Sequence, residues 1–471
     1  MTQAGNAERF ARAAARLEAA LWPPALGQVL ARLRADGHVA VLVGGTVRDV
    51  LLGRASGAAF DVATDRVPQE VLALFERVEP IGLAHGTVLV LADGVRIECT
   101  TLRTEGVYAD ARRPSSVRFT RDPLADLARR DLTVNAMAWD PEARRLLDPF
   151  GGLDDLEAGV LRAVGDPRDR FTEDALRPLR VARFAAVLEM MPEPATRAAL
   201  GVGLERADGV AAERVRDELD RMLVAQRPSR GLELLRESGW LARVLPELDA
   251  CAGVTQNRHH AYDVYRHSLE VCDAAPAQRP DVRWAALLHD IGKPGTRVER
   301  EGEGTFHGHA EAGARLADAR LEALRFPAMR RQHVVHLIRE HMFEYRPEWS
   351  DAAVRRWLRR VGLDHLDDLF ALRGADAAGT GVPSDAPALA ELRERVERVL
   401  AASRVLTVRD LPVDGADVMR IAGIGPGPEV GRMLGELLER AIEDPGEATR
   451  EALIARLERM CTRVHQEPRS P

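Results

Sequence analysis

Two adjacent glycines, Gly44 and Gly45, follow an apolar run and precede a helical pattern in LVGGTVRD. Backbone N–H groups without flanking side chains can face a phosphate, and the N-terminus of a helix adds a favourable partial charge. Arg48 would bring a full positive charge to the same place. Because a Gly-Gly pair alone is usually only a tight connection, the phosphate site is a hypothesis that needs support from neighbouring motifs.

Two acidic residues are suited to metal-dependent phosphoryl transfer. Such a reaction needs carboxylates that converge on Mg²⁺, because the ion orients the attacking hydroxyl and offsets charge that develops on the phosphate. Asp61, in AFDVAT, is the first candidate, and Glu98 on a predicted neighbouring strand is the second. The sequence therefore predicts Asp61 and Glu98 as catalytic residues, with Asp61 as a metal ligand.

The elements that must position these residues lie in the first third of the chain. Apolar runs predict strands over 38–45, 86–92 and 95–102, with a helix over VRDVLLG between the first two. After the turn-rich segment that ends near residue 159, a period of 3.6 residues replaces the strand pattern. We predict an α+β head with a small mixed sheet, an all-α neck, an all-α third domain rich in histidine, and a helical tail. Their limits are 1–150, 151–245, 246–385 and 386–471.

Composition narrows the class of protein. The 471 residues carry a net charge of −7, which argues against a chain that is basic throughout, although a local basic face is enough to bind nucleic acid. The four cysteines form no CxxC pair, so neither a disulfide framework nor a thiolate zinc site is indicated. No signal peptide or membrane-spanning run is evident, and we expect a cytoplasmic protein without membrane contact.

Four arginines lie close together in one predicted loop and offer a plausible path for an RNA backbone: Arg112, Arg113, Arg118 and Arg121.

Five motifs in fixed order resemble the class II tRNA nucleotidyltransferase and bacterial poly(A) polymerase family, over residues 23–225: LVGGTVRDVLLG, FDVATD, YADARRP, DLARRDLTVNAMAWD and FTEDALRPLRVARFAA. The resemblance implies transfer of CMP or AMP from CTP and ATP to the 3′ end of tRNA or another RNA, with Mg²⁺ in the head. It assigns triphosphate contacts to Gly44, Gly45 and Arg48, and a place in a flexible loop to Asp110. Ribose and phosphate contacts are implied for Arg129, Arg130, Asp131 and Asn135.

The same resemblance implies a protein template for the incoming nucleotide. Glu173, Asp174 and Arg177 match the family's Glu-Asp-x-x-Arg motif, in which the Asp and Arg side chains read the base edges of CTP and ATP. A helix would hold Asp174 and Arg177 at i and i+3 on one face, although such a pair can also be an ordinary salt bridge. Arg180 and Arg183 would extend this face towards the RNA.

One residue departs from the family pattern. The FDVAT segment of the family carries an Asp-x-Asp pair that binds two Mg²⁺ ions, and here Ala59 stands at the position of the first carboxylate. No other acidic residue lies between Asp49 and Asp61, so a shift of one residue does not restore the pair. Three interpretations remain open, namely an engineered inactivating change, a natural loss of transfer, and a single-metal site that uses Asp61 and Glu98.

Histidines and aspartates of the third segment resemble the His…His-Asp…Asp (HD) superfamily of metal phosphohydrolases, over residues 255–380. The resemblance rests mainly on LLHDIGKPG and implies that His267, His289, Asp290 and Asp376 hold a divalent transition metal that activates water. His309 and His341 lie where the superfamily often has extra ligands, so a dinuclear site is possible. We expect His307, His333 and His336 to be surface or packing residues.

Together these features predict a CCA-adding type of RNA nucleotidyltransferase joined to an HD phosphohydrolase domain. A poly(A) polymerase is one alternative, and a transferase-inactive RNA-binding protein whose catalysis is hydrolytic is a second, prompted by Ala59. A nucleotide-sensing regulatory protein is a third. The segment over 406–445 resembles the tail that follows this metal domain in the same bacterial fusion.

Overall fold

The computed structural model describes residues 3–54, 59–83, 86–105, 117–256, 261–300, 303–380 and 386–464. The chain forms two compact units. The first consists of residues 1–249 with 323–325, and the second of 250–322 with 326–471. The finer, four-part division stays a prediction.

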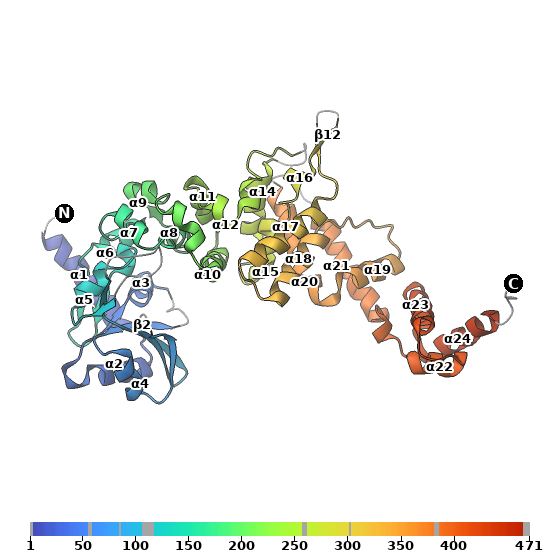
Figure 1. Ribbon diagram of the computed structural model, residues 1–471, viewed down its shortest axis with the longest axis horizontal. Helices are drawn as coiled ribbons and strands as arrows, with labels where there is room; N and C mark the ends of the chain where they lie inside the picture. The colour runs from blue at the N-terminus through green and yellow to red at the C-terminus, as the bar shows by residue number, and fades with distance from the viewer. Residues whose placement is uncertain are drawn as a thin grey trace. The chain divides into compact units, whose positions relative to one another are not determined.

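A seven-stranded mixed sheet forms the base of the first unit (Figure 1). Its order is β3-β4-β5-β2-β1-β8-β9, in which β2 pairs with β5 in parallel and the other five pairings are antiparallel. Asp61 and Glu98 are direct partners in the parallel pair. The strands are β1 (Ala40–Val43), β2 (Phe60–Thr64), β3 (Val78–Gly82), β4 (Thr87–Ala92), β5 (Val95–Thr101), β8 (Ala138–Asp140) and β9 (Arg145–Leu147).

The turn from β1 into helix α3 (Gly45–Leu51) depends on glycine. Gly44 has φ of +62°, a backbone conformation that other residues rarely adopt. A Cβ at Gly44 would also lie 2.8 Å from Nη1 of Arg130. Both facts explain why the β1–α3 connection has no side chain where the chain passes the cavity described below.

Helices surround the sheet and then form the rest of the first unit. Near the sheet lie α1 (Gln3–Ala19), α2 (Pro24–Arg34), α4 (Pro68–Leu74), α5 (Pro123–Ala128) and α6 (Gly152–Ala158). The helical part continues with α7 (Pro167–Glu173), α8 (Arg177–Leu188), α9 (Pro194–Ala199), α10 (Ala212–Leu223), α11 (Ser229–Glu237), α12 (Leu241–Val244) and α13 (Pro246–Asp249). Two short strands, β10 (Val160–Leu161) and β11 (Met191–Pro192), pair in parallel.

The helix predicted to carry both Asp174 and Arg177 is interrupted. Asp174 has extended backbone angles (φ −137°, ψ 111°) and ends α7, whereas Arg177 begins α8. A continuous helix would require the N–H of Pro178 to bond the carbonyl of Asp174, but proline has no N–H and its ring would clash there. The prediction of one helix was therefore wrong, and Pro178 was the signal that could have corrected it.

The second unit is mainly helical. Helix α14 (Val264–Ala274) packs on α15 (Pro280–Leu288) and α20 (Leu363–Gly379), and α15 also packs on α18 (Ala328–Glu340). A hairpin of β12 (Val298–Arg300) and β13 (Glu303–Thr305) adds strands to this predicted all-α domain. The other helices are α16 (Lys293–Thr296), α17 (His309–Ala323), α19 (Asp351–Val361) and α21 (Ala386–Ala402).

The tail has an apolar core of its own. Buried residues such as Leu437, Ile442 and Leu457 join α22 (Gly415–Ala422), α23 (Pro428–Glu443) and α24 (Arg450–Val464). The predicted class, a mixed-sheet head followed by helical domains, is confirmed. Among the described residues, no helix combines the length and the apolar character needed to cross a bilayer.

Candidate active sites

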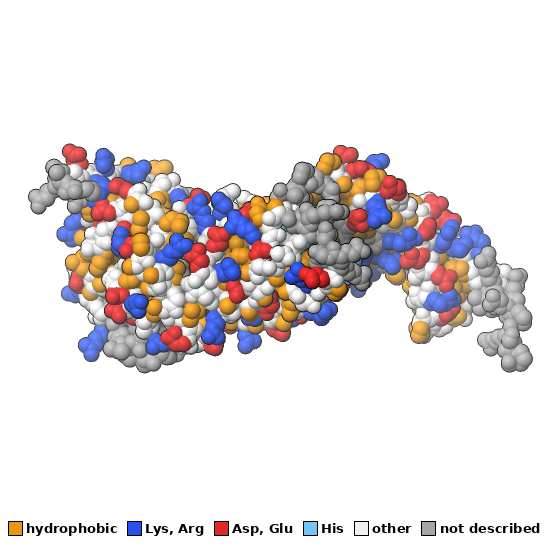
Figure 2. All heavy atoms as spheres, turned by 90° about the horizontal axis from the view of Figure 1, so that it is seen from above, with side chains coloured by type: hydrophobic (Ala, Val, Ile, Leu, Met, Phe, Trp, Pro, Cys, Tyr) orange, Lys and Arg blue, Asp and Glu red, His pale blue; other side chains and the backbone are white. Residues whose placement is uncertain are grey.

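A cavity of about 730 Å³ in the first unit brings together most residues predicted for the head site. Nine arginines and four carboxylates line it, so its walls carry an excess of positive charge suited to a polyanionic ligand. On the face shown in Figure 2, by contrast, basic and acidic side chains are interspersed. The predicted residues in the lining are Gly44, Gly45, Arg48, Asp61, Glu98, Arg129, Arg130, Asp131, Asn135, Asp174, Arg177, Arg180 and Arg183.

Asp61 and Glu98 form the acidic pair of this cavity. They lie side by side on β2 and β5, and the Asp61 backbone N–H donates to Thr46 Oγ1 at 2.7 Å. Burial and the nearby Glu98 raise the pKa of Asp61, while Arg130 and Arg48 lower it. A half-buried carboxylate next to a second one is a suitable ligand set for a hard cation such as Mg²⁺. Ala59 stands directly before β2 and offers only a methyl group.

Arg48 and Asn135 are coupled across the head. Arg48 Nη1 donates to Asn135 Oδ1 at 2.5 Å, and Asn135 Nδ2 donates to Asp131 Oδ1 at 3.2 Å. Asp131 in turn pairs with Arg180 Nε at 2.7 Å. Burial alone would raise the pKa of Asp131, but Arg180 and the Asn135 hydrogen bond hold that pKa well below its usual range. The chain therefore holds four potential phosphate or ribose contacts in one network.

The side chains of the two template residues have separate partners, as the base-reading interpretation allows. Asp174 Oδ2 pairs with Arg214 Nη2 at 2.8 Å, while Arg177 Nη1 donates to Glu173 Oε2 at 2.5 Å. Arg177 Nη2 donates to the carbonyl of Arg129 at 3.1 Å. Asp174 and Arg177 do not form a salt bridge with each other in the described contacts, yet both line the cavity. A carboxylate and a guanidinium are thus held separately at its wall.

Sequence reasoning missed two supporting residues. Glu218 on α10 is buried and pairs with Arg183 Nε at 2.6 Å, so Arg183 is a buried ion-pair partner rather than a solvated charge. Asp126 is also buried and accepts from Arg129 and Arg130. In the sequence both acids look like ordinary charges of a helix surface. Asp110, Arg112 and Arg113 lie outside the described residues.

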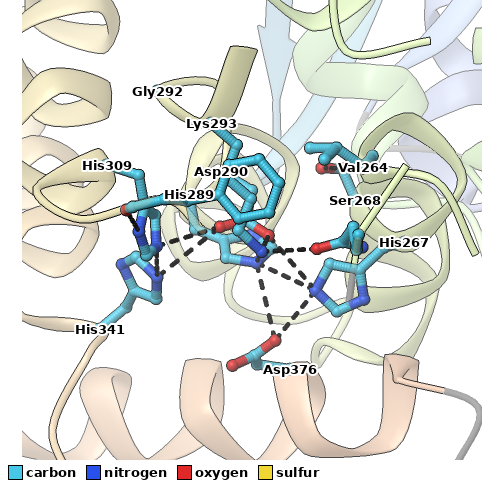
Figure 3. A network of polar contacts seen from close by, with 12 residues as sticks. Val264, His267, Ser268, His289, Asp290, Gly292, Lys293, His309, His341 and Asp376 are labelled. Atoms are coloured by element: carbon cyan, nitrogen blue, oxygen red, sulfur yellow. Dashed lines mark hydrogen bonds and ion pairs between the residues drawn. The ribbon is translucent and has the colours of Figure 1, made fainter. Parts of the chain in front are cut away.

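The second site is a buried cluster of four histidines and two aspartates (Figure 3). His267 lies on α14, and His289 with Asp290 directly follows α15. His309 begins α17, His341 follows the end of α18, and Asp376 lies on α20. All six residues predicted for a metal site in the third segment are thus in one place.

Each histidine of this cluster is oriented by a backbone carbonyl. Nδ1 of His267 donates to the carbonyl of Gly379 (3.1 Å), and Nδ1 of His289 donates to that of Ala286 (2.8 Å). Nδ1 of His309 donates to the carbonyl of Phe306 (2.8 Å), and Nδ1 of His341 donates to that of Ile338 (2.6 Å). Because a carbonyl can only accept, each Nδ1 carries a proton, and in the neutral form of each ring the lone pair lies on Nε2. The Nε2 atoms of His267 and His289 are 3.2 Å apart, and those of His309 and His341 are 3.4 Å apart. This arrangement is the one that orients histidines as metal ligands.

Asp290 lies between two potential metal-binding groups. Its Oδ2 is 3.2 Å from His289 Nε2, and its Oδ1 is 3.4 Å from His309 Nε2. His267, His289 and Asp290 form one group able to hold an ion, and Asp290, His309 and His341 form the other. Asp290 Oδ1 is buried and accepts no hydrogen bond in the described structure. A buried carboxylate oxygen without a donor is costly, so this atom fits a cation.

Burial keeps part of this cluster in the protonation state that metal binding needs. Burial and the neighbouring His289 lower the pKa of His341 to about 3, and burial also lowers the pKa of His309. Both rings are therefore neutral at pH 7. Burial alone would raise the pKa of Asp376, but His267 and His289 hold it well below its usual range.

Lys293 is a member of the site that sequence reasoning did not single out. It is the only lysine among the 66 lysines and arginines of the chain, and its Nζ pairs with Asp290 Oδ2 at 2.5 Å. Nζ also donates to Gln256 Oε1 at 2.7 Å. In a chain that uses arginine everywhere else, one retained lysine was the available signal. The ammonium group of lysine is compact and fits beside the carboxylate, whereas the guanidinium group of arginine is wider, planar and less strongly hydrated.

Two glycines let helices approach the cluster closely. A Cβ on Gly292 would overlap the carbonyl oxygen of His309 and lie 2.6 Å from the backbone nitrogen of Gly313. A Cβ on Gly379 would lie 2.5 Å from Cγ2 of Val271. Gly292 therefore sets the distance between the His289-Asp290 turn and α17, and Gly379 sets the distance between α14 and α20. Of the histidines set aside, His333 and His336 are half-buried near His365, and His307 is exposed.

Comparison with known proteins agrees with the two sites. The poly(A) polymerase head domain matches residues 40–162, a probable RNA and SrmB-binding site of polymerase A matches 189–251, and the HD domain matches 258–377. A CCA-adding enzyme of Streptococcus gordonii is 35% identical over 88% of this chain and 92% of its own length. The chain belongs to the CCA-adding enzyme family.

Two further members of this group are informative. An A-adding tRNA nucleotidyltransferase of Deinococcus radiodurans is 38% identical over 68% of this chain and 76% of its own length. The crystal structure of the Bacillus stearothermophilus CCA-adding enzyme in complex with CTP superposes with a TM-score of 0.72 at 29% identity, covering 95% of this chain and all of that one. The chain is therefore a nucleotidyltransferase-family enzyme that carries an HD domain.

Proposed function

We propose that the head transfers CMP or AMP from CTP or ATP to the 3′ end of tRNA. The cavity lined by nine arginines carries this proposal, because it can hold a triphosphate and an RNA end next to Asp61 and Glu98. The names of relatives that add CCA or A to tRNA support tRNA rather than a poly(A) substrate. A tRNA substrate would place the enzyme in the cytoplasm.

In this mechanism the chain's own residues bind and orient the reactants. Gly44 and Gly45 leave room for the triphosphate, and Arg48 and Arg130 offset its charge. Asp61 and Glu98 would hold Mg²⁺, which supplies charge neutralisation at the α-phosphate when bound. The RNA 3′ hydroxyl attacks that phosphate and pyrophosphate leaves. The ribose and phosphates would contact Arg129, Asp131, Asn135 and Arg180.

Nucleotide choice is assigned to Asp174 and Arg177. The carboxylate accepts hydrogen bonds and the guanidinium donates them, so together they can pair with the edge of either cytosine or adenine. Both side chains line the cavity and have fixed partners, Arg214 for Asp174 and Glu173 for Arg177. Such support is what a template needs to discriminate between two bases.

We also propose that the second unit hydrolyses phosphoesters. His267, His289, Asp290 and Asp376 would hold one divalent metal, and His309 and His341 would complete a second site that shares Asp290. The metal supplies a water activated near neutral pH. The four carbonyl-oriented imidazoles favour a borderline transition metal over Mg²⁺ in this unit.

A second candidate function follows from Ala59. If the head needs two carboxylates on β2, this chain binds RNA without transferring nucleotides, and its catalysis is hydrolytic. The experiment measures incorporation of labelled CTP and ATP into tRNA that lacks CCA, tRNA that ends in its first C, and tRNA that ends in CC. It compares this chain with Ala59→Asp, and Ala59→Asn is the uncharged control. Incorporation by the unaltered chain supports the single-metal head. Incorporation by Ala59→Asp alone supports the silenced head, and none by either contradicts the transferase.

A further inference from the structure

A second cavity of the HD-containing unit lies outside both sites described above. It has a volume of about 580 Å³ and is formed by the segment that leaves α18 and by helix α19. Met342, Phe343 and Trp349 line it from the segment, and Arg356, Trp357 and Arg360 line it from the helix. The head cavity and the histidine cluster share none of these residues.

Aromatic side chains are concentrated at this cavity. Only 4% of the chain is aromatic, yet two of its six tryptophans line the same wall. The rings of Trp349 and Trp357 have centroids 6.4 Å apart, and those of Phe343 and Trp357 have centroids 5.1 Å apart. Met342 beside them is 57% exposed. Phe343 and Trp357 are almost fully buried and support the half-buried ring of Trp349, so Trp349 and Met342 are the apolar groups on which a flat ligand can stack.

The polar groups of the cavity are those that a nucleotide would satisfy. Trp357 is 4% exposed, and its Nε1–H is buried without a hydrogen-bond acceptor in the described structure. Because solvent does not reach this atom, it offers a ligand no hydrogen bond, and the accessible polar groups of the cavity are those of Glu344, Arg356 and Arg360. Glu344 at the same wall can accept from an exocyclic amino group.

Positive charge lies at the rim on one turn of α19. Arg356 pairs with Glu439 and Glu443 of α23, and Arg360 Nε pairs with Glu340 at 2.9 Å. These arginines are 45% and 59% exposed, and because exposed ion pairs contribute little to stability, a phosphate can replace their partners. Residues four apart on a helix face the same side, which lets both guanidiniums reach one phosphate.

The cavity is continuous in sequence with the metal-binding cluster. Met342 immediately follows His341, and the Phe343 N–H donates to the His341 carbonyl at 3.1 Å. We propose that this cavity is a nucleotide-binding subsite of the HD domain, which stacks a base on Trp349 and binds its phosphate through Arg356 and Arg360. The use of this subsite in hydrolysis rests on the proposed phosphohydrolase, but nucleotide binding does not.

The experiment uses the full chain with 5-fluorotryptophan at its six tryptophans. Fluorine resonances, assigned by single Trp→Phe changes, are followed while AMP, adenosine or the trinucleotide CCA is added. We expect the Trp349 and Trp357 signals to move with AMP and those of Trp240 and Trp284 to stay. Trp349→Ala should weaken binding of AMP and adenosine by roughly 5-fold to 100-fold, the range for one stacked base.

The charge at the rim has a matched control. Arg360→Gln should weaken binding of AMP by roughly 10-fold and leave adenosine unaffected, because adenosine has no phosphate. Arg359→Gln removes an equal charge from a residue that pairs with Glu439 but does not line the cavity. This control should leave the binding of both AMP and adenosine unaffected. Tighter binding of CCA than of AMP identifies an RNA end as the ligand, and equal binding identifies a free nucleotide.

Two outcomes would overturn the subsite. One is a lack of movement of the Trp349 and Trp357 signals at millimolar AMP and CCA. The other is movement with an apolar peptide and not with nucleotides, which would make the cavity a protein-docking surface. Loss of phosphohydrolase activity without loss of these shifts would contradict the proposed hydrolase and leave the subsite standing.

Discussion

The head and HD sites differ in how much of their metal chemistry the protein has assembled. In the HD site, the Nε2 atoms of four imidazoles surround a carboxylate with an unpaired buried oxygen. In the head, two carboxylates face a wall of arginines, and Ala59 leaves the metal position with fewer ligands. The HD residues therefore fit a metal ion held by the protein alone. The head cavity fits a polyanion, and we propose that its Mg²⁺ enters with that ligand.

The strongest test of this difference is removal of the carboxylate shared by the two HD groups. Asp290→Asn keeps the shape of the side chain but removes its charge, so both groups should lose their metal. We expect phosphohydrolase activity to fall by at least about 100-fold, with loss of bound metal measured by plasma mass spectrometry. Transfer to tRNA should change less than about twofold, since the head shares no ligand with this site. Equal loss of both activities would show that the head and HD sites are not independent.

The head should instead be most sensitive at its base-reading wall. Arg177→Ala removes a donor from the cavity, and we expect the ratio of CMP to AMP incorporation to change by about 10-fold or more. Single-turnover transfer with competing CTP and ATP measures this ratio. Arg170→Ala is the control, because Arg170 also pairs with Glu173 but does not line the cavity. An unchanged ratio in Arg177→Ala would remove the template role.

A smaller effect is expected where glycine sets helix spacing in the HD site. Gly292→Ala should push α17 and His309 away from Asp290 and weaken metal binding by about 10-fold. Gly295→Ala, on helix α16 directly after Gly292, would place a Cβ that meets no atom within 4 Å and serves as the control. Calorimetric titration with a divalent metal ion compares the metal affinities of the two variants. Equal affinities would show that the close approach is not needed for ligation.

The smallest predicted effect is a change in the pH profile of transfer. Burial raises the pKa of Asp61 and Arg130 lowers it, so Arg130→Gln should raise that pKa further. Because the ionised carboxylate is the form that holds Mg²⁺, the acid limb of the pH–rate profile should move to higher pH in Arg130→Gln. The phosphohydrolase profile should not move. A shift of the transfer profile to lower pH would contradict the proposed role of Asp61.

Sequence reasoning succeeded where chemistry follows from order along the chain. An apolar run predicted the strand of Glu98, and the FDVAT motif singled out Asp61, although the strand of Asp61 and its parallel pairing with that of Glu98 were not predicted. The order of His267, His289, Asp290 and Asp376 likewise predicted the residues that meet in the HD cluster.

What could not be predicted depends on contacts between distant elements. Glu218 and Arg214 lie on a helix whose charges follow an ordinary surface pattern, and their pairing with Arg183 and Asp174 exists only after α8 and α10 pack. The carbonyl of Gly379 that orients His267 is 112 residues away from it. The break between α7 and α8 was predictable from Pro178, because a proline there excludes a continuous helix.

The independence of the head and HD sites is tested most directly by incorporation of labelled CMP and AMP into tRNA lacking its 3′ end. The unaltered chain, Asp61→Asn and Asp290→Asn would be compared in the presence of Mg²⁺. We expect incorporation by the unaltered chain and by Asp290→Asn, and its loss in Asp61→Asn. Incorporation that survives Asp61→Asn, or that Asp290→Asn abolishes, would contradict it.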